Sequence, residues 1–242
     1  MKLQNFFLSV FVMVAALYAP AEAMSKSKKS KKARKGRLSA ATTRSAETSA
    51  STRTLSLRII NQTFQQPFSP FFVMVHNDQA EPLYTRGVQS SEALAILAED
   101  GDPSALVTMY EDSVDVMQAF SAGGLTLPGE TRNIEVTITD EFPLVSIASM
   151  CVNTNDCFVS LNGAALESGA TLNTPGNDAG SEVNNEDCSC IPGPACANFE
   201  KLDGNCGEGE GYVHVHRGVH GVADLVPSEV DWRNPMMRVI VS

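Results

Sequence analysis

Apolar and polar residues alternate along much of the chain after residue 54, and a period of two is typical of β-strands that bury one face. The alternating segments are 54–60, 133–139, 144–148, 158–161, 212–216 and 237–241, and a compact apolar run covers 71–75. Gly, Pro, Asn and Asp residues separate these segments. Short strands with turn residues between them predict an all-β fold, an antiparallel β-sandwich.

Two segments have a helical pattern instead. Residues 90–99 begin with two serines and continue with a stretch rich in Ala and Leu, which predicts a short helix with a serine N-cap. A second helical patch covers 103–110. We expect one or two short peripheral helices, packed on the outside of the sandwich or over one of its ends.

The first 23 residues have the three parts of a secretory signal peptide. Lys2 supplies a positive n-region, Phe6–Leu17 is an apolar core, and residues 21–23 form a small-x-small cleavage site. The apolar core is shorter than the ~20 residues of a spanning helix, although an uncleaved anchor is the alternative. No later segment is long and apolar enough to span a membrane. The sequence therefore predicts a secreted, extracellular chain that starts at Met24 and does not span the membrane.

Residues 24–54 differ in composition from the part that follows. They contain ten Lys or Arg, one acid and no aromatic residue, whereas residues 55–242 contain seven Lys or Arg and 26 Asp or Glu. The net charge of −10 therefore combines a basic segment with an acidic domain. A Lys/Ser-rich segment of this kind cannot bury enough apolar surface to offset the entropy of ordering it, so we predict disorder over 24–54. We predict one folded domain over 55–242.

Three uses of the basic segment remain open. It could bind an acidic polymer or surface by charge neutralisation, fold back on the acidic domain, or serve as a solvated linker or pro-segment. The secretory route takes the chain away from nucleic acid. We therefore expect an extracellular protein, a polysaccharide or a mineral surface as the partner, and no nucleic acid.

Six cysteines fit the oxidising compartment that a signal peptide implies. They are Cys151, Cys157, Cys188, Cys190, Cys196 and Cys206. The first two flank a short turn between two predicted strands, which places them opposite each other. We therefore predict a disulfide between Cys151 and Cys157.

The remaining four cysteines lie in a Gly- and Pro-rich part of the chain. Cys188 and Cys190 are too close in sequence to bond easily within an extended segment, so we expect each to pair with Cys196 or Cys206. The alternative is a zinc site made of these four thiolates. Their spacing matches neither a zinc ribbon nor a zinc finger, and it favours disulfides.

Two acidic loops supply the first candidate metal site. Asp156 ends a strand-connecting turn, and Asp178 and Glu182 lie four residues apart around a glycine that permits a tight turn. Loops from distant parts of the sequence gather at the end of a sandwich, so the three carboxylates can meet. Calcium takes about six to eight oxygen ligands, and we predict that this triad binds it. Glu186 and Asp187 are either extra ligands or solvated loop charges, and an ordinary acidic surface is the alternative for the triad.

The histidines supply the second candidate. They are His76, His214, His216 and His220. His214 and His216 alternate on a predicted strand and share one face, His220 could fold back after a glycine turn, and His76 ends another strand. Imidazoles at this spacing are common zinc or copper ligands, although a hydrogen-bonded polar strand face is the alternative.

A water on such a metal would be the one route to catalysis that the sequence offers. The sequence contains no nucleophile elbow, phosphate-binding glycine loop or zincin helix, so we do not predict an enzyme.

Two further residues have candidate roles. Asn61 begins a glycosylation sequon. Trp232 is either a binding anchor or a packing plug that closes one end of the sandwich.

Three short signatures follow one another in the last third of the chain. They are Thr-Asn-Asp-Cys-Phe-Val-Ser-Leu at 154–161, Asn-Asp-Ala-Gly-Ser-Glu at 177–182, and Gly-Tyr-Val-His-Val-His-Arg-Gly-Val-His-Gly at 211–221, which runs on to Asp-Trp-Arg-Asn-Pro at 231–235. In this order and spacing they resemble the spondin domain of extracellular matrix proteins, and most closely its secreted, single-domain microbial type. The resemblance covers roughly residues 54–242.

The resemblance implies a C2-like β-sandwich that binds calcium and acts in extracellular adhesion or matrix binding. The family's calcium-binding carboxylates occupy the positions of Asp156, Asp178 and Glu182, with Glu here in place of Asp at the last one. Animal members lack the His-x-His pattern, so the calcium precedent does not extend to the histidines. The competing hypotheses are a zinc or copper protein, including a metalloenzyme, and a polyanion- or mineral-binding protein that acts through its basic segment.

Overall fold

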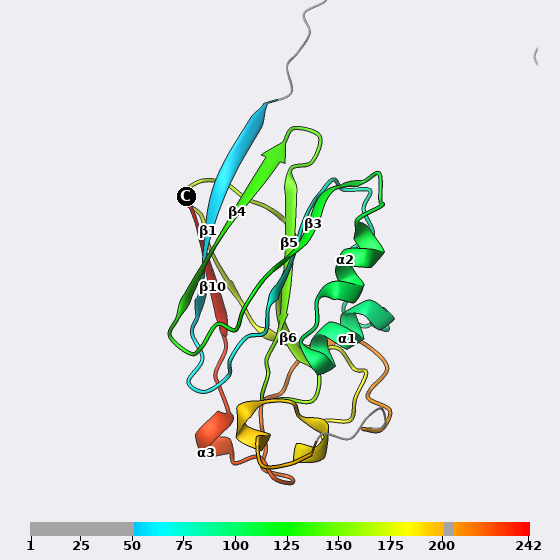
Figure 1. Cartoon of the computed structure of the whole chain (residues 1–242), viewed down its shortest axis with the longest axis vertical. Coiled ribbons are helices and arrows are strands. Elements are labelled where there is room, and N and C mark those ends of the chain that lie inside the picture. The colour runs from blue at the N-terminus through cyan, green and yellow to red at the C-terminus, as the bar shows by residue number, and fades with distance from the viewer. Residues whose placement is uncertain (1–50, 201–205) are drawn as a thin grey trace, which may run out of the picture. The chain divides into compact units, whose positions relative to one another are not determined.

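Two antiparallel sheets packed face to face form the part of the chain that the computed structural model describes, residues 51–200 and 206–242 (Figure 1). One sheet has four strands in the order β4–β1–β10–β7, and the other has six in the order β3–β2–β5–β6–β8–β9. The predicted β-sandwich is confirmed. The signal peptide predicted at 1–23, and the predicted basic segment up to residue 50, lie outside the described residues.

The strands are β1 (Thr52–Asn61), β2 (Phe71–His76), β3 (Val116–Ala122), β4 (Thr131–Thr139), β5 (Leu144–Met150), β6 (Cys157–Ala165), β7 (Thr171–Thr174), β8 (Gly176–Asp178), β9 (His214–Val215) and β10 (Met237–Val241). The helices are α1 (Glu92–Asp100), α2 (Ser104–Tyr110) and α3 (Pro227–Val230), with two 3₁₀ turns, η1 (Cys188–Cys190) and η2 (Pro194–Cys196). Within these residues no helix is both long and apolar enough to cross a membrane.

The four-stranded sheet buries one face, as its alternating sequence predicts. Leu55, Leu57 and Ile59 of β1 point into the space between the sheets, and the residues between them are more exposed. β1 already begins at Thr52, where it pairs with Thr139 of β4. The domain that we predicted to start at residue 55 thus has its first strand three residues earlier, because Thr and Arg side chains on an exposed strand face do not interrupt the pairing.

The six-stranded sheet is buried on both faces, which explains the compact apolar run at 71–75. In β2, Phe71 and Val73 face the core between the sheets, whereas Phe72 and Met74 belong to a second core. Helices α1 and α2 supply the other side of that second core, and Figure 1 shows them beside β3 and β5. The predicted peripheral helices are thus observed.

The two helices begin and end close to the predicted residues. Ser91 caps α1 by accepting a hydrogen bond from the Leu94 amide at 3.2 Å, and Gly101 ends the helix in the left-handed conformation, φ 71°. Strands β3, β7 and β8 are not evident in the sequence pattern. They are short or partly exposed, so pairing with neighbouring strands, rather than hydrophobic periodicity, defines them.

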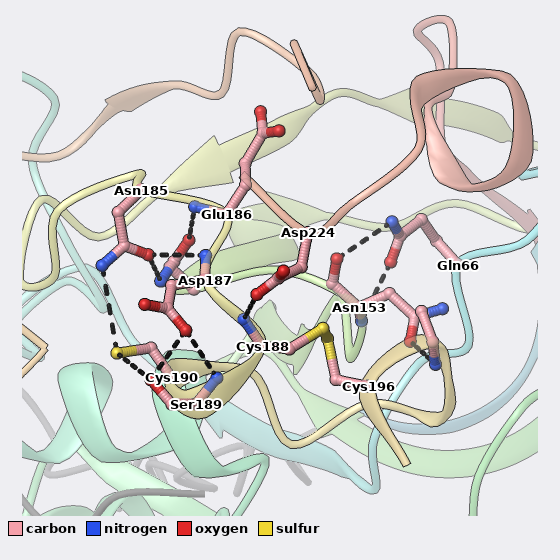
Figure 2. The surroundings of a disulfide bond; sticks show 12 residues. Gln66, Asn153, Asn185, Glu186, Asp187, Cys188, Ser189, Cys190, Cys196 and Asp224 are labelled. Carbon is pink, nitrogen blue, oxygen red and sulfur yellow. Dashed lines mark hydrogen bonds between the residues drawn. A yellow bond between two sulfur atoms is a disulfide. The ribbon is translucent and has the colours of Figure 1, made fainter. Parts of the chain in front are cut away.

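Two disulfides hold the loops at one end of the sandwich. Cys188 bonds to Cys196 and Cys190 to Cys206, so each early cysteine pairs with a later one as predicted. Figure 2 shows the Cys188–Cys196 bond, with the Asp224 carboxylate accepting a hydrogen bond from the Cys188 amide. These bonds keep an otherwise irregular segment packed against the end of the sheets.

The disulfide predicted between Cys151 and Cys157 is wrong in this structure. The two residues lie opposite each other across the turn, as expected, but their Sγ atoms are 3.0 Å apart and form a thiol hydrogen bond. Both side chains are fully buried. Burial raises the pKa of the Cys157 thiol, which keeps it protonated and unreactive. The turn geometry brings the sulfurs together without joining them.

We therefore expect two thiols per chain that react only after unfolding. Without reductant, Ellman's reagent should detect none in the native protein, because both sulfurs are buried, and two in denaturant. Peptide mapping should place them at Cys151 and Cys157. Absence of thiols in denaturant would mean that the bridge forms after all.

The sequon residue Asn61 is not available to a glycan in the folded chain. Its side chain is fully buried and its amide donates to the carbonyls of Gln66, at 2.8 Å, and Thr126, at 3.0 Å. Its Oδ1 accepts from the amide and the hydroxyl of Thr63. The sequon's own threonine is thus part of an internal network, and the glycosylation hypothesis for Asn61 is corrected to a structural role.

Replacement of Asn61 by Ala should lower the free energy of unfolding by about 2–4 kcal/mol, since it leaves buried carbonyls without donors. Urea denaturation measures this change. The matched control is Asn173→Ala on the exposed face of β7, where we expect a loss below about 0.5 kcal/mol. Equal effects of the two substitutions would contradict the structural role.

Candidate metal centre

Strand β6 and the short strands β8 and β9 bring the candidate ligands to one end of the six-stranded sheet. Cys157 at the start of β6 pairs with Asp178 at the end of β8, and Asp178 pairs in turn with His214 in β9. Directly paired residues of an antiparallel ladder have neighbouring side chains on the same face. The ladder therefore places the Asp178 carboxylate beside the His214 imidazole.

Close packing of two loops adds Glu210 to this pair. The Gly211 amide donates to the Gly180 carbonyl at 2.8 Å, so the segment before β9 lies against the turn after β8. Gly180 has φ +67°, and a Cβ at that position would lie 2.3 Å from the Tyr212 carbonyl oxygen. Only glycine permits this approach. The consequence is that Glu210 projects next to Asp178.

The resulting geometry fits a single metal ion. One ligand atom from each of Asp178, Glu210 and His214 lies within 4.8 Å of the other two. His214 Nε2 is 3.4 Å from Asp178 Oδ1 and 3.6 Å from Glu210 Oε2. Ligand atoms that bind one zinc ion at ~2.1 Å are separated by about 3.4 Å at the tetrahedral angle. The two distances from His214 match this spacing, and the group as a whole could hold a metal ion.

The hydrogen bonds of the two histidines assign them different tautomers. His214 Nδ1 donates to the Val215 carbonyl at 3.0 Å, so in the neutral ring Nε2 carries the free lone pair. Burial lowers the pKa of His214, but the Val215 carbonyl and the carboxylates of Asp178 and Glu210 outweigh it and raise the pKa, so a metal ion at Nε2 displaces a proton that these groups favour. His216 Nδ1 instead accepts from the Gly218 amide at 3.0 Å, so its proton is on Nε2. Both Nε2 atoms are buried without a hydrogen-bond partner. His214 is thus ready to bind a metal, whereas His216 presents a donor.

His216 is placed to orient Asp178 rather than to bind the ion. Its Nε2 lies 3.7 Å from Asp178 Oδ2, and its ring packs against Trp232 at 5.1 Å between centroids. Burial lowers the pKa of His216 to about 3, so the imidazole stays neutral. Trp232 is buried and serves as the packing plug, one of its two predicted roles.

Asp156 adds a second buried carboxyl group beside Asp178. Its Oδ2 accepts hydrogen bonds from the amides of Ser181 and Glu182 at 2.8 and 3.1 Å, whereas its Oδ1 is buried without a partner. Burial and the neighbouring Asp178 raise the pKa of Asp156 to about 7. Burial also raises the pKa of Asp178, against the hydrogen bonds from Asn184 and Gly180. Two buried acids at one place are the environment that a bound cation stabilises.

The structure brings only part of the predicted calcium triad into the centre. Asp156 and Asp178 lie together, and Glu182 is buried nearby. Within the part of the chain described here, however, the group with ligand atoms in mutual reach contains Glu210 in place of Asp156 and Glu182. Sequence reasoning missed Glu210, although an acid between two glycines, four residues before His214, is a signal that could have found it.

His76 does not join the predicted histidine cluster. It lies at the far end of the six-stranded sheet, where its Nδ1 donates to the Asn77 carbonyl and its Nε2 accepts from the Ser146 hydroxyl. Both ring nitrogens are therefore satisfied, and burial lowers the pKa of His76. The structure thus shows a hydrogen-bonded core histidine at this position, where we predicted a metal ligand.

His220 also lies outside the ligand group. It is half-exposed, and its Nδ1 is 3.8 Å from Glu186 Oε1. Glu186 accepts hydrogen bonds from the backbone amides of residues 220–222, so it braces this loop and is not an extra calcium ligand. Asp187 caps η1 through Ser189 (Figure 2). Both acids thus have structural partners.

Comparison with known proteins adds no assignment: no family model matches the chain, and no curated protein matches it significantly. The donor atoms and their surroundings are therefore the features that indicate a function.

The metal-free protein should lose stability as the pH rises from about 4 to about 7. The folded-state pKa of Asp156 is about 7 against an ordinary 3.8, so the native state holds this proton more tightly than the unfolded chain does. We expect about 1–3 kcal/mol less stability near pH 7.5 than near pH 5, measured by urea denaturation after chelation. Asp156→Asn should remove most of this slope, and the exposed control Asp78→Asn should keep it. An unchanged slope in Asp156→Asn would contradict the assignment.

Proposed function

We propose that this protein is a metal-binding β-sandwich module in which Asp178, Glu210 and His214 hold one divalent cation. The observation that carries the proposal is the buried Nε2 of His214. In the neutral ring it has a free lone pair, and it has no hydrogen-bond partner but a carboxylate oxygen at 3.4 Å and another at 3.6 Å. A metal ion at this point satisfies the imidazole and neutralises the buried charge of Asp178.

The donor set favours zinc or another transition metal. One imidazole nitrogen with two carboxylates is a common zinc combination, and imidazole is a poor ligand for calcium. The outer contacts support the same choice, because the Val215 carbonyl fixes the His214 ring and His216 faces Asp178. Zinc is therefore the first candidate and copper the second.

Calcium binding is the second candidate function, and a different observation supports it. Asp156 Oδ1 is a fully buried carboxylate oxygen without a partner, and it lies beside Asp178. An oxygen-only site around these two residues agrees with what the resemblance to spondin domains implies. Both candidate sites use Asp178. They differ because zinc binding requires His214 and calcium binding does not.

The biological setting that we propose is extracellular. The signal-peptide pattern and the two disulfides support it, as does the likeness to a matrix-protein module. In that setting the cation organises the loops at one end of the sandwich for adhesion or matrix binding. The partner is an extracellular protein, a polysaccharide or a mineral surface.

Calorimetric titration of the metal-free protein with zinc and with calcium tests the site. His214→Ala should weaken zinc binding by at least about 100-fold, because it removes a direct ligand, and should leave calcium binding unchanged. His220→Ala is the matched control, since this half-exposed imidazole lies outside the ligand group. Asp178→Asn should weaken the binding of either ion. Zinc affinity that survives His214→Ala would overturn the proposed centre.

A further inference from the structure

A pocket of about 220 Å³ adjoins the proposed metal centre and contains a positive group that the centre does not use. Its walls include Glu210, which is a proposed ligand, and His216, which faces Asp178. Arg217 and His220 contribute the cationic side of the same pocket. The volume is several times the ~30 Å³ that one water molecule occupies in the liquid. The pocket therefore has room for a small ligand next to the ion.

The acidic groups of the pocket are already occupied. Glu186 accepts three backbone amide hydrogen bonds from residues 220–222, and Glu210 accepts one from the Asn184 side chain while it faces the metal position. Arg217, in contrast, makes no ion pair or hydrogen bond with its side chain within residues 51–200 and 206–242. The acids of the pocket have partners and the Arg217 guanidinium has none within these residues. This guanidinium is therefore free to bind a ligand.

The coordination sphere of the proposed metal ion also has an open position. The chain supplies three ligands, whereas zinc usually takes about four, and the fourth position of such sites holds water or an exogenous ligand. Glu210 belongs both to the ligand group and to the pocket wall, so the pocket reaches the ion from that side. A group that binds the metal there lies within the pocket that Arg217 lines.

We propose that this pocket binds an oxyanion, a carboxylate or a phosphate group, which takes the open metal position and pairs with Arg217. A guanidinium matches the two oxygens of such a group with parallel hydrogen bonds. His220 adds a donor from the half-exposed side of the pocket. The proposal rests on the proposed metal-binding function and names the ligand class of that site.

Cobalt(II) in place of zinc reports the coordination sphere through its visible absorption. The full chain is first loaded with cobalt, and its metal affinity is measured. Acetate, inorganic phosphate and neutral acetamide are then titrated separately. We expect a saturable spectral change with acetate or phosphate and none with acetamide. The anion that binds more tightly shows whether the pocket prefers a carboxylate or a phosphate group.

Two variants test the role of the guanidinium. Arg217→Gln should weaken anion binding by roughly 5- to 20-fold and leave cobalt affinity unchanged. Arg58→Gln makes the same change of charge at an exposed position of β1, in the other sheet, and should change neither. Equal anion affinity in Arg217→Gln and the native chain, or no spectral change with either anion, would overturn the inference while the metal site stands. Failure of cobalt and zinc to bind at all would overturn the metal site first, before any anion is added.

Discussion

The buried carboxylate of Asp178 is the constraint on which this end of the molecule depends. A charge taken out of water is costly unless partners surround it, and Asp178 has the Gly180 amide, the Asn184 side chain and two imidazoles around it. Each partner comes from a loop or a short strand that has little hydrophobic core of its own. The need to satisfy this carboxylate thus joins β8, β9 and the loops between them.

The rest of the fold provides a rigid base for that arrangement. The six-stranded sheet is buried between the four-stranded sheet and helices α1 and α2, so its strands cannot shift without disturbing two cores. β6 lies between β5 and β8 in this sheet and begins at Cys157, directly after Asp156, so it places both residues beside β8. The position of the candidate centre is therefore set by the packing of the sheet, and the loops only complete it.

One disulfide anchors the loop that supplies Glu210 to the site. Cys206 precedes the glycine-rich segment 207–211 that carries Glu210, and its bond to Cys190 anchors the beginning of that segment to η1. The other end is anchored by the pairing of His214 with Asp178. A segment fixed at both ends loses less entropy when Glu210 binds an ion, which favours a preformed site.

The sequence by itself determined the sandwich and helices α1 and α2, because strand alternation, the helical pattern and the Ser91 cap of α1 are local signals that the packed structure obeys. It also indicated Asp178 and His214 as candidate ligands, since carboxylates in a glycine turn and histidines at alternate strand positions are readable patterns. Only the tertiary structure decided that these two residues share a ladder with each other, that Glu210 completes the group, and that His76 lies at the opposite end of the sheet. It also separated His214 from His216, because the tautomer of each ring depends on a backbone partner that no spacing reveals. Which side chains meet is decided by strand pairing and loop packing between distant segments, and those contacts are not encoded in any single stretch of the chain.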